Sequence, residues 1–168
     1  EFSHSLAKLG ANLILVDRDK IKLKKLKSNL LIKYKIDIDL HVVDFEKEKQ
    51  RIIMINNIIK KHKLIDVIIN NAAFVGASKL KNWSTNFENQ SIDTWNRAIE
   101  VNLTSVFHIC QGLLPLLQLS KNASIINIGS MHGFLAPEWS LYKDTNMSNP
   151  AAYSVSKAGI IHLTKWLA

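Results

Sequence analysis

Hydrophobic residues along the chain follow two alternating patterns. Short runs of branched and aliphatic side chains have the composition of strands buried on both faces of a parallel sheet, and they cover residues 13–16, 38–43, 67–69 and 124–128. The segments between them carry apolar residues at helical spacing and are long enough for crossover connections, and they cover residues 19–34, 46–62 and 91–119. Repeated strand-helix-strand units predict an α/β fold with a doubly wound parallel sheet in three layers, α/β/α.

The two ends of this pattern are abrupt. The chain has 168 residues, 47% of them hydrophobic, so we expect residues 1–168 to form a single domain around one core. It begins at Glu1 rather than methionine, and the apolar residues that follow already lie on one helical stripe. At the other end a helical pattern runs to Ala168 without a glycine or proline stop signal. We therefore predict a domain that is truncated at both ends.

The formal net charge of +8 raises the question of a nucleic-acid partner. The lysines of residues 20–35, and Lys60, Lys61 and Lys63, alternate with Leu and Ile at helical spacing. This pattern is typical of the solvated faces of amphipathic helices, and no nucleic-acid recognition motif accompanies it. We therefore expect no nucleic-acid partner.

Cysteine usage and hydropathy indicate the compartment. A single cysteine, Cys110, excludes an intramolecular disulfide and agrees with a reducing environment. No apolar stretch approaches the roughly eighteen uninterrupted residues that a membrane span requires, and Pro115 interrupts the longest candidate. No secretory signal is visible. We expect a cytoplasmic protein with no membrane partner, and no metal site is predicted.

The strongest candidate for chemistry stands at the start of the last predicted helix. Asn149 can cap this helix, and Pro150 fits its first turn. Tyr153 and Lys157 are four residues apart, so their side chains project from the same face. Lowering the pKa of a tyrosine by roughly three units, to make it a base at neutral pH, requires about 4 kcal/mol of phenolate stabilisation, which a nearby ammonium can supply. The alternative is an ordinary amphipathic helix with a surface tyrosine and lysine.

A hydroxyl group is expected near this pair. Ser130 follows the strand of residues 124–128 through Gly129, so it reaches the carboxyl edge of the predicted sheet, where ligands bind in such folds. Its hydroxyl can hold a substrate oxygen beside Tyr153. The alternative is a serine that starts a loop and bonds to the local backbone.

Two asparagine motifs complete the set of candidates. The run Asn70-Asn71-Ala72-Ala73 closes the strand of residues 67–69, where small side chains let a cofactor approach and the asparagines can tie neighbouring strand ends together. Asn102 lies within the long helix although Asn is a mediocre helix former, and on the inner face it can hold a water molecule. The alternatives are a simple turn and a solvent-facing asparagine.

Together these motifs resemble the short-chain dehydrogenase/reductase family in order and approximate placement, over essentially the whole chain. The positions that carry the resemblance are Asp44, Asn70, Asn71, Ala72, Ala73, Asn102, Ser130, Tyr153 and Lys157. The resemblance implies one NAD(P)-binding Rossmann-like domain. It also implies an oxidoreductase that transfers a hydride between NAD(P) and a small alcohol or carbonyl substrate, and that assembles as a homodimer or homotetramer.

The resemblance also implies a role for each position. Tyr153 would be the general acid/base, and Lys157 would lower its pKa while binding the nicotinamide ribose. Ser130 would orient the substrate oxygen, and Asn102 would hold a water molecule in the proton relay. The residues that would contact the adenosine half of the cofactor are Asp44, Phe45, Asn71, Ala72 and Ala73. The family's glycine-rich turn, which places the pyrophosphate at a helix N-terminus, would precede Glu1.

Asp17, at the end of the strand of residues 13–16, bears on the choice of cofactor. A carboxylate there can accept both ribose hydroxyls of NAD, and it would repel the 2′-phosphate of NADP by up to roughly 4 kcal/mol at an effective dielectric constant of about 20. NAD is therefore favoured. Arg18 keeps NADP open because a guanidinium can pair with that phosphate. A third interpretation is that Asp17 only caps the helix that follows.

The segment between Ser130 and Tyr153, residues 131–152, is longer than in most family members. Its residues resemble a subgroup of flagellin-modification and surface-glycan oxidoreductases. The segment lies where substrate would enter, so His132, Glu138 and Trp139 can contact a sugar through hydrogen bonds and stacking. The other interpretation is a surface loop closed by its own aromatic residues.

A competing function is a non-catalytic dinucleotide-binding or scaffold protein of the same fold, because a fold does not determine a function. The complete set of Asn102, Ser130, Tyr153 and Lys157 favours the enzyme, since a sensor has no need for a poised phenol. Nucleic-acid binding through the basic helices ranks last, because it would require a recognition motif that the sequence lacks.

Overall fold

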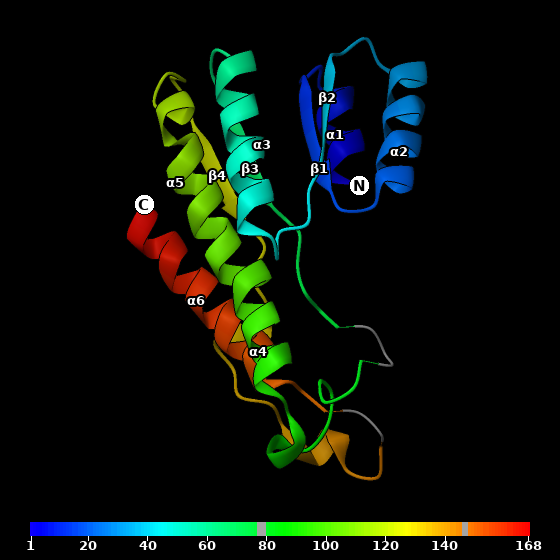
Figure 1. Ribbon diagram of the computed structural model, residues 1–168, viewed down its shortest axis with the longest axis vertical. Helices are drawn as coiled ribbons and strands as arrows, with labels where there is room; N and C mark the ends of the chain where they lie inside the picture. The colour runs from blue at the N-terminus through cyan, green and yellow to red at the C-terminus, as the bar shows by residue number, and fades with distance from the viewer. Residues whose placement is uncertain (77–79, 146–147) are drawn as a thin grey trace. The chain divides into compact units, whose positions relative to one another are not determined.

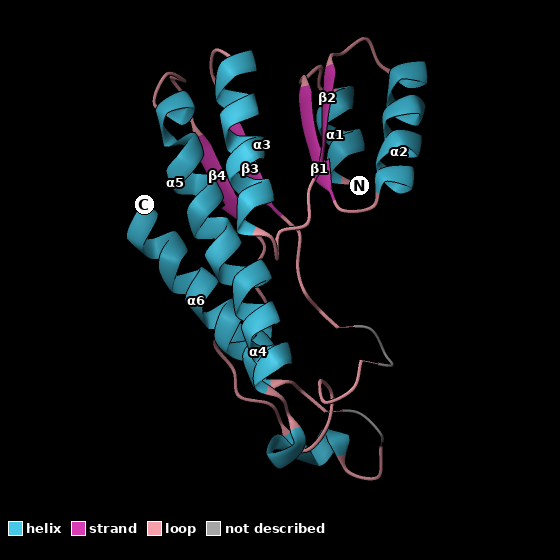
Figure 2. Ribbon diagram, in the orientation of Figure 1, coloured by secondary structure: helices cyan, strands magenta, loops and turns pink. Residues whose placement is uncertain are grey.

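A computed structural model describes residues 1–76, 80–145 and 148–168, and it is an α/β structure with parallel strands (Figures 1 and 2). The contacts divide the chain into two compact units, Glu1–Met54 and Ile55–Ala168. Each unit contains one pair of parallel strands. The α/β class and the parallel pairing predicted from the hydrophobic pattern are confirmed, whereas the single domain stays a prediction.

The first unit is built around a parallel strand pair. It contains α1 (Phe2–Lys8), β1 (Leu13–Asp17), α2 (Lys20–Lys33), β2 (Ile38–Val42) and the beginning of α3 (Glu48–Lys61). In the strand register Leu13 lies opposite Ile38 and Asp17 lies opposite Val42. The core consists of apolar residues from both strands and from the helices, namely Ala7, Leu13, Leu15, Leu23, Leu30 and Ile38. Leu23 and Leu30 are seven residues apart, so both lie on the face of α2 that is turned to this core.

The second unit contains the other strand pair, β3 (Val67–Asn70) and β4 (Ser124–Asn127). Its helices are α4 (Ile92–Ile99), α5 (Ser105–Leu117) and α6 (Ala151–Leu167), with short 3-10 turns η1 (Phe87–Asn89), η3 (Met131–Gly133) and η4 (Trp139–Tyr142). α4 and α6 pack against each other, whereas α5 packs against β3. All four strands lie within a residue or two of the ranges predicted from the sequence.

The long helix predicted for residues 91–119 is interrupted. A π-helical turn, η2 (Glu100–Thr104), separates α4 from α5, and Asn102 is buried at its centre. Such widened turns inside helices are rare and often occur at functional sites. The sequence predicts the extent of this rod correctly but not the turn inside it.

The capping arrangement predicted for α6 is wrong by one residue. Pro150 is the N-cap, with φ −66° and ψ 129°, so helical geometry begins only at Ala151. Asn149 therefore lies one position too early to cap the helix, and its Oδ1 accepts a hydrogen bond from the Ser154 hydroxyl at 2.9 Å. Within the described part of the chain, no helix combines the length and the apolar character needed to cross a membrane.

Candidate active site

The ends of β3 and β4 are tied together by side chains. Asn70 Nδ2 donates to Asn127 Oδ1 at 2.8 Å, and the Ile128 backbone N–H donates to the Asn70 carbonyl at 3.1 Å. The prediction that asparagines join neighbouring strand ends is therefore confirmed for Asn70. Asn127 extends the link by donating from Nδ2 to Thr164 Oγ1 on α6, at 2.9 Å. The exits of two parallel strands and the last helix are thus held in one hydrogen-bonded cluster.

Lys157 is buried where β4 ends. Its side chain is 4% exposed, and Nζ donates to the Ile128 carbonyl oxygen at 2.6 Å. Nζ also lies 5.9 Å from the centroid of the Tyr153 ring, one helical turn earlier on α6. Burial disfavours the ammonium and lowers the pKa of Lys157 below its ordinary value. Only one of the three ammonium protons has a hydrogen-bond acceptor among the described residues, so two remain for a ligand or water.

Ser130 caps the turn η3, which sits directly on α6. Its Oγ accepts from the His132 backbone N–H at 3.3 Å. A Cβ added to Gly133 would lie 2.8 Å from the backbone carbonyl of Lys157, so only glycine permits this close approach. The Ser130 segment is therefore held against the same turn of α6 that carries Lys157.

Tyr153 is half-buried on the first turn of α6. It packs against a cluster of buried residues, Phe74, Trp83, Ala98 and Ala152. Among the described residues, its phenol oxygen has no hydrogen-bond partner. The second unit thus brings Tyr153 next to Lys157, and Lys157 next to the strand exit that leads to Ser130.

Asn102 is 1% exposed, and its side chain is occupied by protein partners. Oδ1 accepts from the Phe74 backbone N–H at 2.6 Å, while Nδ2 donates to the Phe74 carbonyl at 3.1 Å and to Ser156 Oγ at 3.0 Å. Both amide protons are therefore used, and a water molecule can reach this side chain only at the second lone pair of Oδ1. The water-holding role implied for Asn102 stays a prediction.

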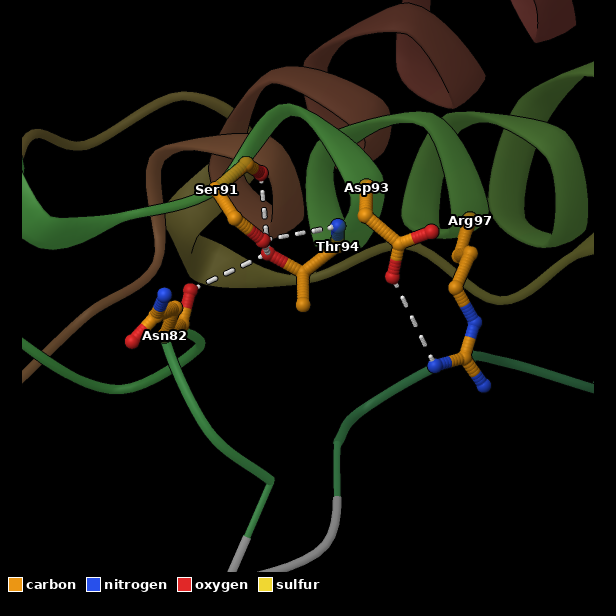
Figure 3. A network of polar contacts seen from close by, with 5 residues as sticks. All are labelled: Asn82, Ser91, Asp93, Thr94 and Arg97. Atoms are coloured by element: carbon orange, nitrogen blue, oxygen red, sulfur yellow. Dashed lines mark hydrogen bonds and ion pairs between the residues drawn. The ribbon is translucent and has the colours of Figure 1, made fainter.

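The start of α4, which leads to Asn102, is fixed by a polar network that the sequence patterns did not reveal (Figure 3). Ser91 caps the helix by accepting from the Thr94 N–H at 3.2 Å. Thr94 Oγ1 in turn donates to the Asn82 carbonyl at 3.1 Å. Farther along, Arg97 pairs with Asp93 at 4.0 Å. A serine directly before a helical apolar pattern is a capping signal, but the partner Asn82 is defined only by tertiary structure.

The candidates for the adenosine end of a cofactor are divided between the units. In the first unit, Asp17 is exposed at the end of β1, and its Oδ1 accepts from the Asp19 N–H at 2.8 Å. The half-buried Asp44 follows β2, with Oδ1 accepting from the Glu46 N–H at 3.0 Å, and the carbonyl of Phe45 accepts from the buried Arg51 guanidinium. Asn71 and Ala72 are exposed after β3, and Ala73 is half-buried there.

Part of the segment of residues 131–152 folds on itself. The rings of Trp139 and Tyr142 lie 5.8 Å apart, and Glu138 accepts from the Ser140 N–H at 3.2 Å. Hydrogen bonding from the Ser140 side chain, and after it from the Ser140 backbone, holds the pKa of Glu138 below its usual range. Trp139 is nevertheless 59% exposed, and the buried Nδ1 of His132 has no hydrogen-bond partner in the described structure. Residues 146 and 147 lie outside the described residues.

The structure is thus an α/β protein with parallel strand pairs, and one helix at the exit of a strand carries both Tyr153 and Lys157. The family model of the short chain dehydrogenases matches residues 1–168, and the chain therefore belongs to this family. The resemblance stated from the motifs is confirmed.

Individual relatives are moderately similar. The 3-oxoacyl-(acyl-carrier-protein) reductase FabG of Thermotoga maritima is 30% identical over 75% of this chain and 43% of its own length. Post-translational flagellin modification protein A of Campylobacter coli is 28% identical over 92% of this chain and 59% of its own. A solved short-chain dehydrogenase from Sphingobium yanoikuyae, in complex with NADPH, is 26% identical with a TM-score of 0.79, over 99% of this chain and 58% of its own. The chain spans about half the length of the curated relatives it matches.

Proposed function

We propose that the protein is an oxidoreductase that transfers a hydride between NAD(P) and an alcohol or carbonyl substrate, with Tyr153 as the general acid/base. The observation that carries the proposal is the position of Lys157, which is buried, bonded to the Ile128 carbonyl and 5.9 Å from the Tyr153 ring. Burying an ammonium costs free energy unless the charge is paired or hydrogen-bonded. A phenolate at Tyr153, one helical turn away, would attract this ammonium and would itself be stabilised by it.

In the direction of alcohol oxidation, the Tyr153 phenolate accepts the proton of the substrate hydroxyl. The ammonium of Lys157 favours that phenolate electrostatically, and it has protons left to donate to the ribose of the cofactor. Ser130 donates its hydroxyl proton to the substrate oxygen and so orients it. The nicotinamide cofactor, when bound, accepts or supplies the hydride. In the direction of reduction, the neutral phenol returns its proton to the substrate oxygen.

We propose that residues of each unit, taken separately, contact the dinucleotide cofactor. Asp17 offers an exposed carboxylate at the end of β1 for ribose hydroxyls, which favours NAD. Asn71 and Ala72 are exposed after β3, where Ala72 leaves room for a ligand to approach the backbone. NADP stays an alternative because Arg18 is exposed beside Asp17 and because the similar Sphingobium yanoikuyae enzyme was solved with NADPH. Asp44 and Phe45 are proposed to flank the adenine.

We propose a sugar-derived alcohol or ketone as the substrate. The similarity to a probable galactose dehydrogenase of Rhizobium meliloti, 35% identical over 62% of this chain and 34% of its own length, supports this class. The exposed indole of Trp139 supports it too, because sugars stack on such rings. Glu138 and His132 supply polar groups in the same segment.

A homodimer or homotetramer in the cytoplasm is proposed as the working state. On α5, Phe107 and Leu114 are seven residues apart and each is nearly half exposed, so they form an apolar stripe on the surface. α6 exposes Val155 and Trp166. Apolar stripes of this kind on two helices are suited to contact with a second copy of the chain.

The test uses the protein expressed from its complete gene. NADH and NADPH absorbance is followed with a panel of sugar and nucleotide-sugar alcohols and ketones, for the wild type, Tyr153→Phe and the control Tyr34→Phe, which alters a half-buried tyrosine of the first unit. We expect Tyr153→Phe to lower kcat by at least about a hundredfold while NADH binding persists, and Tyr34→Phe to retain activity. Equal turnover by Tyr153→Phe and the wild type would remove Tyr153 from the mechanism. Cofactor binding without turnover of any substrate would favour the non-catalytic alternative.

A further inference from the structure

Ser156 lies between the two functional residues of α6 and is completely buried. Its hydroxyl donates to the Tyr153 carbonyl at 2.8 Å and accepts from Asn102 Nδ2 at 3.0 Å. Alanine is a better helix former than serine, and a buried hydroxyl is costly unless it is hydrogen-bonded. The Ser156 hydroxyl therefore stabilises the structure mainly through its hydrogen bond with Asn102, which lies outside α6.

The other side of Asn102 is bonded to the segment that follows β3. The Phe74 backbone receives one bond from Asn102 and gives one to it, and Phe74 comes directly after Asn71, Ala72 and Ala73. A continuous series of hydrogen bonds thus runs from the Phe74 backbone through the Asn102 amide and the Ser156 hydroxyl to the Tyr153 carbonyl.

The Phe74 end of this series is itself firmly held. The Phe74 ring meets the Trp83 ring edge-on with centroids 4.9 Å apart, and the Arg97 guanidinium lies 4.9 Å from the Phe74 centroid. Trp83 Nε1 also donates to the Val75 carbonyl at 3.0 Å. Phe74 is held by several contacts, and Asn102 is hydrogen-bonded to it. The Asn102 amide can therefore fix the position of Ser156.

We propose that Ser156 is a positioning residue for the reaction, which fixes the α6 turn between Tyr153 and Lys157 to Asn102 and to the segment after β3. This inference rests on the proposed function. Without the hydroxyl, the first turns of α6 lose their link to Asn102, and the separation between the phenol and the ammonium becomes less well defined. Small displacements of reacting groups lower the reaction rate strongly.

The test compares Ser156→Ala with Ser154→Ala in the protein from the complete gene. Ser154 is on the same helix, but its hydroxyl bonds to Asn149 and not to Asn102. At temperatures well below each melting midpoint, we expect Ser156→Ala to lower kcat about tenfold. We also expect the pH profile of kcat to differ from that of the wild type, because the ammonium is held less precisely beside the phenol. Ser154→Ala should retain the wild-type kcat and pH profile.

A double-mutant comparison tests the route through Asn102. Since Ser156 acts through Asn102, Ser156→Ala should lower kcat no further in an Asn102→Ala background. The proposal is overturned if Ser156→Ala keeps a wild-type kcat and pH profile, if Ser154→Ala shows the same loss, or if the losses at residues 102 and 156 multiply. Ser156→Cys, which retains a weak donor of similar size, replaces Ser156→Ala if that variant does not fold. Full activity of Tyr153→Phe would instead refute the proposed function itself.

Discussion

The ammonium nitrogen of Lys157 lies 2.6 Å from the carbonyl oxygen of Ile128, two residues before Ser130. This one hydrogen bond joins the helix that carries Tyr153 to the strand exit that carries the serine hydroxyl. A backbone carbonyl at the end of a paired strand has little freedom, so it fixes the charged group more firmly than a surface carboxylate would.

The pH dependence of stability should report the burial of Lys157. Burial lowers the pKa of Lys157 in the native state, so between that value and the ordinary value near 10.5 the unfolded chain binds more protons than the folded one. The contribution of Lys157 to the free energy of unfolding should therefore rise with pH across this window. Urea unfolding of the wild type and Lys157→Met, at pH values from about 7 upward, measures the difference between them. Lys165→Met, at the exposed end of α6, is the control and should show no such slope. A flat difference for Lys157→Met would contradict the expectation.

Asn102→Ala should destabilise the fold. The substitution leaves the Phe74 N–H and carbonyl without their partner, and each unsatisfied buried group costs about 1–3 kcal/mol. We expect the free energy of unfolding to fall by about 2–6 kcal/mol. The matched control is Asn96→Ala on the exposed face of α4, with an expected change within about 0.5 kcal/mol. Equal urea midpoints for the two variants would show that the Phe74 bonds contribute little.

Gly133 and Gly129 should respond differently to alanine. At Gly133 an added Cβ would meet the Lys157 backbone at 2.8 Å, and neither segment can yield without moving η3 away from α6. At Gly129 the nearest atom is an Ile161 side-chain carbon at 3.6 Å, an ordinary contact. We expect Gly133→Ala to lower the melting temperature by several degrees, and Gly129→Ala to leave it nearly unchanged. Calorimetry of both variants decides the matter, and a larger loss for Gly129→Ala would run against this packing.

Cys110 should react slowly in the native protein. Burial raises the pKa of its thiol, and the bond from Asn70 Nδ2 offsets only part of this effect. Because the thiolate is the reactive species, a thiol reagent at neutral pH should label the folded chain much more slowly than the urea-unfolded one. Since the sequence contains one cysteine, the unfolded chain should react with a stoichiometry of one. Rapid labelling under native conditions would contradict the burial of Cys110.

The features that could be predicted from the sequence are those that depend on local pattern. The strand exits at Asn70 and Ser130 follow from short apolar runs, and the common face of Tyr153 and Lys157 follows from helical spacing. A hydrogen bond from Asn70 to a neighbouring strand end could be predicted, because residues that end neighbouring parallel strands meet at one edge of the sheet. Its partner, Asn127, could not.

The features that escaped prediction depend on contacts between distant segments. The three hydrogen bonds of the Asn102 side chain join it to Phe74 and Ser156, and the Arg97 guanidinium lies over the Phe74 ring. No local sequence pattern connects these residues. The cap of α6 was missed for a different reason, since Asn149 is a good capping residue that Pro150 displaces by one position. The π turn escaped because one additional residue barely alters apolar spacing over a rod of this length.

The additional residue of the π turn rotates α5 relative to α4 about the helix axis. Successive residues of an α-helix are rotated by about 100°, so η2 (Glu100–Thr104) sets the faces of α4 and α5 independently of each other. Deleting one residue there would restore regular winding and swing Thr94 and Ala98 off the side of α4 that is now buried. Because of the π turn, α4 can face α6 while α5 faces β3. We therefore expect the fold to tolerate a substitution within η2 better than the deletion of one residue there.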